Sequence, residues 1–528
     1  MHYLFFVLFS SLFCCLHCTP IRVKDTLWMD DMSPMDISAL TQSMHLKRLL
    51  GTIQMTALKQ HGRFTDKDPT KLNERLALLK KVDGNDGTEL SVNRQIADEL
   101  FEGDILLSRE QAQQILREIE NIPPIKRKLT RQINPDPNTF WTDLTIAYTV
   151  QANDAALLQA VQAAQRHISS LTCIRFAYYN DPTVLIGKKD YMEYSRQSGC
   201  WSMVGRQGGS QLISIGFGCE SLGIVVHETL HALGLWHEQS RTDQEYYVSI
   251  NYNNILPGTE YNFYKRTPDT SDNLGQPYDL GSVMHYSSKS FAQDFNRFTI
   301  TSLEPAYQQT MGYRVGLSFK DAKMINMRYC SKICAAELAC ANGGYTNPNN
   351  CNRCLCPDGY SGALCDEHPT SESPNCLNTG ALMAGQFPGN ISTLSLTPNT
   401  NCYWKILPDS ADNRVVVTVK KLEFPCEETC SNYVEVKAKQ DKIATGARLC
   451  CAIPATIYAD IGTEVLIILN IVDDFDGNYT GFEIEYKTIS GSALLDKPPP
   501  VPLLNVSNSS AASQEAINVN TIDAACST

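Results

Sequence analysis

Four residues near the middle of the chain have the types and spacing of a catalytic metal site. His227 and His231 stand at i and i+4, so on a helix both imidazoles lie on one face and can reach one ion. Gly234 offers a backbone position that ends the helix and turns the chain, so that His237 returns as a third ligand. Three nitrogen ligands leave one position of a zinc ion open, and Glu228 is placed to deprotonate water there. The pattern H-E-x-x-H-x-x-G-x-x-H therefore predicts a hydrolytic zinc centre.

A lone His-Glu pair on an apolar helix would more often be a satisfied core feature, and the third histidine decides against that reading. The stretch from His227 to Arg241 reads HETLHALGLWHEQSR, and Ser282 to Tyr286 reads SVMHY. Together they resemble the astacin family of metzincin metalloendopeptidases. The resemblance implies that Met284 lies beneath the metal as a soft apolar floor without being a ligand. It also implies that Tyr286 is a switchable fifth ligand that moves to hydrogen-bond the tetrahedral oxyanion.

The same resemblance implies an α+β catalytic domain of two lobes around a zinc cleft, in which Glu228 acts as general base and then proton donor. Glu238 would fix the newly cut N-terminus in a buried ion pair, although without the family it would read as a solvated carboxylate. One departure concerns the family's R-x-D-R-D continuation, because Gln244 and Glu245 stand at its end here. The family pattern pairs the four cysteines of this domain as Cys173 with Cys330 and Cys200 with Cys219.

Upstream, Phe101 to Asp104 reads FEGD and resembles the astacin pro-segment motif, whose aspartate coordinates the zinc in the proenzyme. Asp104 is therefore the candidate latch, and Gly103 lets the backbone approach the cleft closely. Taken alone, these four residues would be a surface turn. A basic cluster that ends at Arg131 follows Pro123 and Pro124 and suits a processing protease, or else is a surface basic patch.

Two modules follow the catalytic domain. The order C-x5-C-x10-C-x2-C-x-C-x8-C from Cys334 to Cys365 resembles an EGF-like module, and a zinc knuckle would need a second CxxC. Residues 376–488 alternate apolar and polar in short runs, which predicts an all-β sandwich. NYVEV and GFEIEY in that region resemble a CUB domain. The implied pairs are Cys334 with Cys351, Cys340 with Cys354, Cys356 with Cys365, and Cys376 with Cys402, while the connectivity of Cys426, Cys430, Cys450 and Cys451 stays open.

Length and composition set the frame for these modules. The chain of 528 residues predicts several domains, and its 43% hydrophobic content excludes a wholly disordered protein. The net charge of −12 disfavours nucleic acid partners. Tyr3 to Leu16 is an apolar run of signal-peptide length, with a buried N-terminal helix as the alternative, and no later segment reads as a membrane span. Removing Cys14, Cys15 and Cys18 leaves 17 of the 20 cysteines, and pairing 16 of them leaves Cys526 as a candidate for intermolecular pairing.

We therefore expect a multidomain secreted zymogen of a zinc-dependent endopeptidase that acts on extracellular proteins. The order of modules looks like that of the nematode astacins, which suggests collagen processing in cuticle or matrix, moulting or hatching. The alternative is a catalytically silent extracellular protein that binds through its EGF and CUB modules. Partners would be protein substrates and a processing protease, with glycosylation at Asn390, Asn478, Asn505 and Asn508. The expected segments are 1–18 signal peptide, 19–131 propeptide, 132–330 catalytic domain, 331–366 EGF-like, 376–488 CUB and 489–528 disordered tail.

Overall fold

The computed structural model describes residues 34–60, 85–97, 99–120, 132–180, 190–267, 271–371, 373–472 and 477–493. The expected signal peptide, the basic cluster, and Asn505, Asn508 and Cys526 lie outside these residues. In the part of the chain that is described, no helix is long and apolar enough to cross a membrane.

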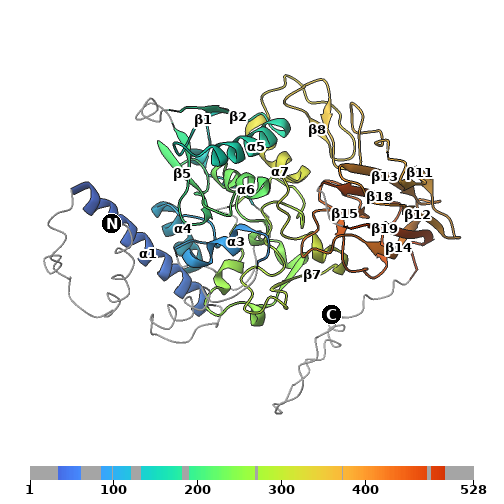
Figure 1. Cartoon of the computed structure of the whole chain (residues 1–528), viewed down its shortest axis with the longest axis horizontal. Coiled ribbons are helices and arrows are strands. Elements are labelled where there is room, and N and C mark those ends of the chain that lie inside the picture. Colours follow the sequence, from blue (N-terminus) through green and yellow to red (C-terminus); the bar gives the residue numbers. More distant parts are fainter. Residues whose placement is uncertain are drawn as a thin grey trace, which may run out of the picture. The chain divides into compact units, whose positions relative to one another are not determined.

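The first half of the catalytic domain is a five-stranded sheet packed against two helices (Figure 1). The strand order is β2-β1-β3-β5-β4, in which only the short edge strand β4 runs antiparallel to its neighbour. Asp154 caps α5 by accepting a hydrogen bond from the Leu157 amide, which satisfies a free donor of the first helical turn. The elements are β1 (Thr145–Val150), α5 (Ala155–Leu171), β2 (Arg175–Tyr178), β3 (Tyr191–Ser195), β4 (Cys200–Trp201), β5 (Ser210–Ile215) and α6 (Leu222–Ala232).

The second half of the catalytic domain has little regular structure. It contains the two-stranded sheet β6 (Val248–Ile250) and β7 (Ile300–Ser302), then α7 (Phe319–Ile325), which continues into a π-helical turn ending at Cys330. The two halves contribute mainly to different apolar cores. Helices α5 and α6 and the first sheet share one core, to which Val283, Met284 and the α7 residues Met324 and Ile325 also belong, whereas most other buried apolar residues of the second half pack with the C-terminal sandwich. The second half therefore depends on the sandwich for much of its burial.

Three α-helices and one 3-10 helix (Asn93–Ile96) precede the catalytic domain in the described residues, the α-helices being α1 (Pro34–Gln60), α3 (Glu89–Val92) and α4 (Arg109–Glu120). Apolar side chains of α1 and α4, such as Ile53 and Ile115, share a core with Trp236 of the catalytic domain. Burial of these side chains ties the pro-segment to the domain that follows it.

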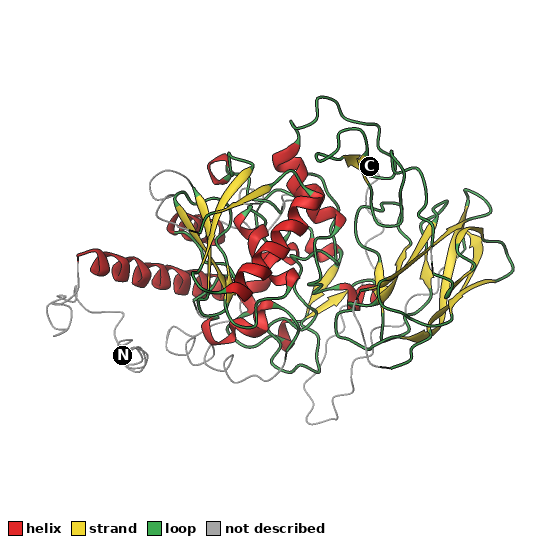
Figure 2. Ribbon diagram, turned by 45° about the horizontal axis from the view of Figure 1, so that its top comes forward, coloured by secondary structure: helices red, strands yellow, loops and turns green. Residues whose placement is uncertain are grey.

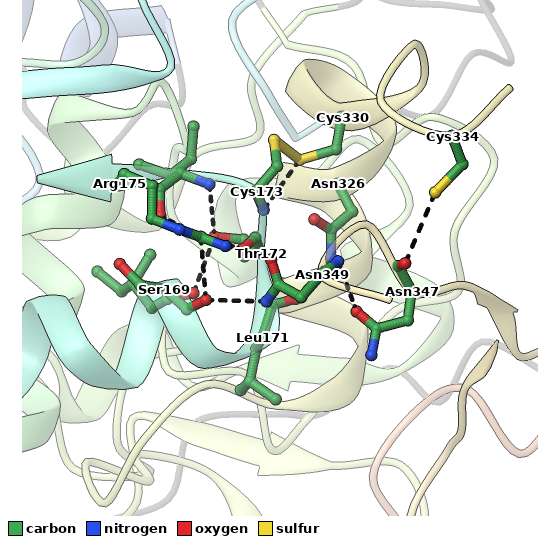
Figure 3. The surroundings of a disulfide bond; sticks show 12 residues. Ser169, Leu171, Thr172, Cys173, Arg175, Asn326, Cys330, Cys334, Asn347 and Asn349 are labelled. Atoms are coloured by element: carbon green, nitrogen blue, oxygen red, sulfur yellow. Dashed lines mark hydrogen bonds between the residues drawn. A yellow bond between two sulfur atoms is a disulfide. The ribbon is translucent and has the colours of Figure 1, made fainter. Parts of the chain in front are cut away.

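The EGF-like module contains only the two-residue strands β8 (Tyr345–Thr346) and β9 (Cys354–Leu355) and is held by three disulfides. Figure 3 shows how it meets the catalytic domain beside the disulfide between Cys173 and Cys330. There the amide of Asn349 donates to the carbonyl oxygens of Ser169 and Ser170 at 3.0 and 3.1 Å. The junction is thus fixed by polar contacts at the end of α5.

The C-terminal body is a sandwich of two five-stranded sheets, which Figure 2 shows as a strand-rich region without long helices. The sheet orders are β10-β12-β19-β14-β17 and β11-β13-β18-β15-β16, and only the β11–β13 pair is parallel. The alternating runs of the sequence thus fold as the expected sandwich, with Trp404 and Phe482 edge to face in its core. The strands are β10 (Cys376–Leu377), β11 (Gly380–Met383), β12 (Gly389–Thr393), β13 (Thr400–Leu407), β14 (Asn413–Glu423), β15 (Tyr433–Lys437), β16 (Ala447–Leu449), β17 (Ile457–Tyr458), β18 (Val465–Ile471) and β19 (Gly481–Ser490).

The sandwich contacts the second half of the catalytic domain through main-chain groups, hydroxyls and two partly exposed ion pairs, Lys289 with Glu428 and Lys439 with Glu304. Around Gly281 the packing is close, because a Cβ atom added there would lie 2.5 Å from Cγ2 of Thr445. Hydrogen bonds across this contact include those from Thr445 N to Asp279 Oδ1 (3.0 Å), from Arg448 N to Thr310 Oγ1 (3.0 Å), from Thr429 Oγ1 to Met311 O (2.7 Å) and from Cys430 N to Gln309 O (3.2 Å).

Candidate metal centre

Helix α6 positions the first two histidines. Ser221 caps its N-terminus, and every residue from Gly223 to Ala232 is buried. His227 and His231 lie one turn apart with ring centroids 4.6 Å from each other. Gly234 has a φ of +103°, in the region that favours glycine, and the chain turns back there. His237 thereby comes within 5.3 Å of the His227 ring, centroid to centroid.

Asp104 of the pro-segment completes the cluster. Its Oδ2 atom lies 3.2 Å from Nε2 of His227 and 3.0 Å from Nε2 of His237, and Oδ1 lies 3.6 Å from Nε2 of His231. All four ligand atoms lie within 4.8 Å of one another, and all four residues are buried. Ligand atoms this close together fit around one small cation.

Atoms without partners support a metal in this place. Nε2 of His231 and Oδ1 of Asp104 are buried and have no hydrogen-bond partner among the described groups, and neither has either carboxylate oxygen of Glu228. Unpaired buried polar atoms are costly and usually have a cause. A zinc ion between the four side chains would satisfy the first two, since imidazole nitrogen and carboxylate oxygen are its ordinary ligands. The donor set therefore fits zinc.

Hydrogen bonds to the outer ring nitrogens orient the imidazoles. Nδ1 of His227 lies 2.7 Å from the Val283 carbonyl, and Nδ1 of His231 lies 2.8 Å from the Leu235 carbonyl. Each carbonyl accepts the Nδ1 proton and leaves Nε2 free to face the centre. Nδ1 of His237 instead lies 2.8 Å from a carboxylate oxygen, Oε2 of Glu102.

Burial and neighbouring carboxylates shift the acidities in the site. Burial lowers the pKa of His231 to about 4, so this imidazole is neutral and able to bind a metal. Burial raises the pKa of Glu228 well above its ordinary value, and the negative charges of Asp104 and Glu89 add to the rise. Two of these three causes, the charges of Asp104 and Glu89, come from residues that precede the catalytic domain.

A turn further along the chain carries two other expected residues, Met284 and Tyr286. Met284 is fully buried, and its carbonyl accepts a hydrogen bond from the Glu238 amide at 2.9 Å. The ring of Tyr286 lies 4.8 Å from that of His237, and its hydroxyl donates to the Glu102 carbonyl at 2.6 Å. The tyrosine hydroxyl thus binds the segment that precedes the catalytic domain.

Glu238 is buried and bound to cations of the catalytic domain itself. Its Oε2 atom lies 2.6 Å from Nζ of Lys320, and Oε1 lies 3.2 Å from the guanidinium of Arg241. Lys320 also contacts the side chain of Gln132, the first described residue after the basic cluster. The uncut chain therefore already neutralises this carboxylate, and the expected pairing with a new N-terminus stays a prediction.

Two residues of the pro-segment were missed by the sequence reasoning. Glu89 is fully buried and forms a two-pronged ion pair with Arg314, at 2.8 Å from Nε and 2.7 Å from Nη2. The pair holds the pKa of Glu89 at about 2 even though burial opposes this. Glu102, the other one, stands inside the FEGD motif, which was the signal available for it. Glu89 has no such signal, because its partner lies 225 positions away.

The pro-segment runs along the edge of the first sheet at this site. Ile105 forms a parallel bridge with Ser202, just after β4, and the Ser202 amide donates to the Asp104 carbonyl at 3.1 Å. Glu102 and Gly103 both have positive φ angles, of 47° and 82°. This turn directs the Asp104 side chain at the three histidines.

Eight disulfides are formed among the described residues, and two of the expected glycosylation sites lie there as well. The catalytic, EGF-like and first CUB pairs are those expected from the resemblance, and Asn390 and Asn478 are exposed. The pairing that was left open is Cys426 with Cys451 and Cys430 with Cys450. The other six pairs are Cys173–Cys330, Cys200–Cys219, Cys334–Cys351, Cys340–Cys354, Cys356–Cys365 and Cys376–Cys402.

The sequence is similar to that of several known proteins. The family model described as Astacin, a peptidase family, matches residues 133–330. Zinc metalloproteinase nas-37 of Caenorhabditis elegans is 45% identical, over 85% of this chain and 56% of that protein. Zinc metalloproteinase nas-36 of the same organism is 35% identical, over 78% of this chain and 70% of that protein. Zinc metalloproteinase dpy-31 of Haemonchus contortus is 31% identical, over 86% of this chain and 83% of that protein.

Among solved structures, high choriolytic enzyme 1, a hatching enzyme zinc-protease from Oryzias latipes, is 35% identical. The match covers 37% of this chain and 92% of that one, with a TM-score of 0.32. The chain spans about half the length of two of its relatives, 56% of nas-37 and 54% of zinc metalloproteinase nas-30, also of Caenorhabditis elegans.

Proposed function

We propose that this chain, which belongs to the astacin family of zinc metalloproteinases, is the precursor of a secreted endopeptidase. The observation that carries the proposal is the cluster of three histidines and one acid, with ligand atoms within 4.8 Å of one another, beside a glutamate whose two carboxylate oxygens have no partner among the described groups. Zinc bound there supplies a Lewis acid for a peptide carbonyl and a water of lowered pKa.

The residues of the chain perform the proton transfers. Glu228 takes the proton of the attacking water and delivers it to the leaving amine, which requires its carboxylate to be ionised at the start. Release of Asp104 and Glu89 removes two charges that raise its pKa. Release of Glu102 frees the Tyr286 hydroxyl, which then donates to the oxyanion. Removal of the pro-segment therefore prepares both groups together.

Asp104 is the group that keeps the precursor inactive. Its carboxylate stands within 3.6 Å of all three Nε2 atoms, where substrate and water would have to enter. Cutting after the basic cluster would allow the segment to leave. The eight disulfides of the described residues support an oxidising, extracellular location.

The substrates we propose are extracellular proteins, with collagens of cuticle or matrix as the first class to test. This narrower proposal comes from the family resemblance and the order of modules. Moulting or hatching would be the setting in which such cleavage is needed. The EGF-like and CUB modules would select partners rather than take part in the chemistry.

The test is cleavage of casein and collagen by the chain cut after the basic cluster. Replacing Glu228 by alanine should lower the rate by about 10²- to 10⁴-fold, as loss of a general acid–base does, and a chelator should abolish cleavage. The control is Glu337→Ala, which changes an exposed carboxylate of the EGF-like module. Equal cleavage by wild type, chelated protein and Glu228→Ala would instead favour a silent binding protein.

A further inference from the structure

The three histidines of the zinc site differ in what holds their outer nitrogens. His227 and His231 each donate to a main-chain carbonyl of the catalytic domain, at 2.7 and 2.8 Å. His237 faces the Glu102 carboxylate, which belongs to the pro-segment, at 2.8 Å. Only this third partner is both a carboxylate and removable by proteolysis.

Glu102 is built into this position. Glu102 is 1% exposed, and its backbone adopts a φ of 47°, which is uncommon for a residue other than glycine. The next residue, Gly103, packs so closely that an added Cβ would lie 2.3 Å from Cδ2 of Leu90 and 2.8 Å from Cζ of Phe291. The turn is therefore fixed on both sides, and a strained conformation kept in a packed site points to a role.

A carboxylate on the outer nitrogen makes the other ring nitrogen a stronger metal ligand than a neutral carbonyl does, because it stabilises positive charge on the ring. We propose that Glu102 is a positioning residue for the metal in the uncut chain, so that the precursor holds zinc more tightly than the processed enzyme does. The pro-segment thus contributes one direct ligand, Asp104, and one outer partner, Glu102. This inference rests on the proposed zinc site but adds a role that the latch does not need.

The consequence concerns the order of events. The precursor would take up and keep its ion before the cut, while the peptide that blocks the site also strengthens it. After the cut, His237 loses its carboxylate partner and becomes a weaker donor. The same step that opens the site therefore leaves the ion with less electron density from its ligands and better able to polarise a substrate.

The experiment measures the zinc dissociation constant of the uncut full chain by competition with a chelator. Glu102→Gln and Glu102→Ala should each weaken zinc binding by about tenfold, the lower end of the effect of losing an outer partner. Glu110→Gln, which changes an exposed carboxylate of α4, should leave it unchanged. Cobalt(II) bound in place of zinc should show a shifted visible spectrum in the two Glu102 variants only.

A second measurement separates Glu102 from the latch and does not depend on the Glu102 variants folding. An uncut Asp104→Asn chain keeps Glu102 and should still bind zinc more tightly than the processed wild type. Dissociation constants within twofold of wild type for both Glu102 variants, or an Asp104→Asn chain no tighter than the processed enzyme, would overturn the proposal. Processed wild type and processed Glu102→Gln are chemically identical, so their activity tests the proposed function independently.

Discussion

The segments on either side of the catalytic domain both pack against it, but by different chemistry. The pro-segment places the buried carboxylates of Glu89, Glu102 and Asp104 on cationic or metal-binding side chains. The CUB sandwich uses main-chain amides, hydroxyls and a shared apolar core, and its two ion pairs with the catalytic domain, Lys289 with Glu428 and Lys439 with Glu304, are partly exposed instead of buried. A buried carboxylate is stable only while its partner is present, whereas main-chain bonds and apolar packing do not depend on charge. The first contact is suited to release and the second to permanence.

Breaking the charged contact should have the largest effect on folding. Glu89→Ala leaves the buried Arg314 guanidinium without its two-pronged partner, which should destabilise the uncut chain by about 3–5 kcal/mol. Denaturant unfolding of the uncut chain measures this. The control, Glu99→Ala, removes an exposed ion pair with Lys47 and should cost at most about 1 kcal/mol. Equal effects of the two changes would contradict the comparison.

Acid should weaken the ion pair between Glu89 and Arg314. Because the pKa of Glu89 is about 2 in the fold against an ordinary value of 4.5, its ion pair stabilises the uncut chain fully above pH 4.5. That contribution, on the order of 3 kcal/mol, is lost as the pH falls from about 5 toward about 2. Unfolding free energies of wild type and Glu89→Gln at several pH values should therefore converge toward low pH. A constant gap between them would show that Glu89 does not titrate in this way.

Disturbing the sandwich contact should have a smaller effect. Gly281→Ala places a methyl group against Thr445, and such overpacking should cost about 1–3 kcal/mol. Gly385→Ala is the matched control, because a Cβ atom there meets nothing within 4 Å. Thermal unfolding and limited proteolysis of the uncut chain report both changes. A loss above that of Glu89→Ala would reverse the ranking of the two contacts.

The sequence is informative where function depends on short-range spacing. His227, His231 and His237 lie within eleven residues, so helix geometry and one glycine suffice to bring them together. The sandwich likewise follows from alternation along single strands. Asp104 could be proposed only because its motif resembles that of a known family, since nothing in the spacing links it to histidines more than 120 positions away.

Contacts made by tertiary packing could not be predicted in this way. Glu89 reads as an ordinary helix-starting acid, and its burial depends on how Arg314 is brought near it. The cysteines at 426, 430, 450 and 451 allow three pairings, and only the fold of the sandwich selects one. The second half of the catalytic domain has little periodicity, and most of its buried apolar residues pack against another module.

The main-chain character of the sandwich contact has a consequence for how this architecture changes over time. Amide hydrogens of residues such as Thr445, Arg448 and Cys430 are present whatever side chain the codon specifies. Substitutions can therefore accumulate on the sandwich side of this contact while the donors persist, provided that the side-chain acceptors Asp279 and Thr310 are kept. Duplicated copies of such a gene could diversify the surface of the sandwich and still keep its packing against the catalytic domain.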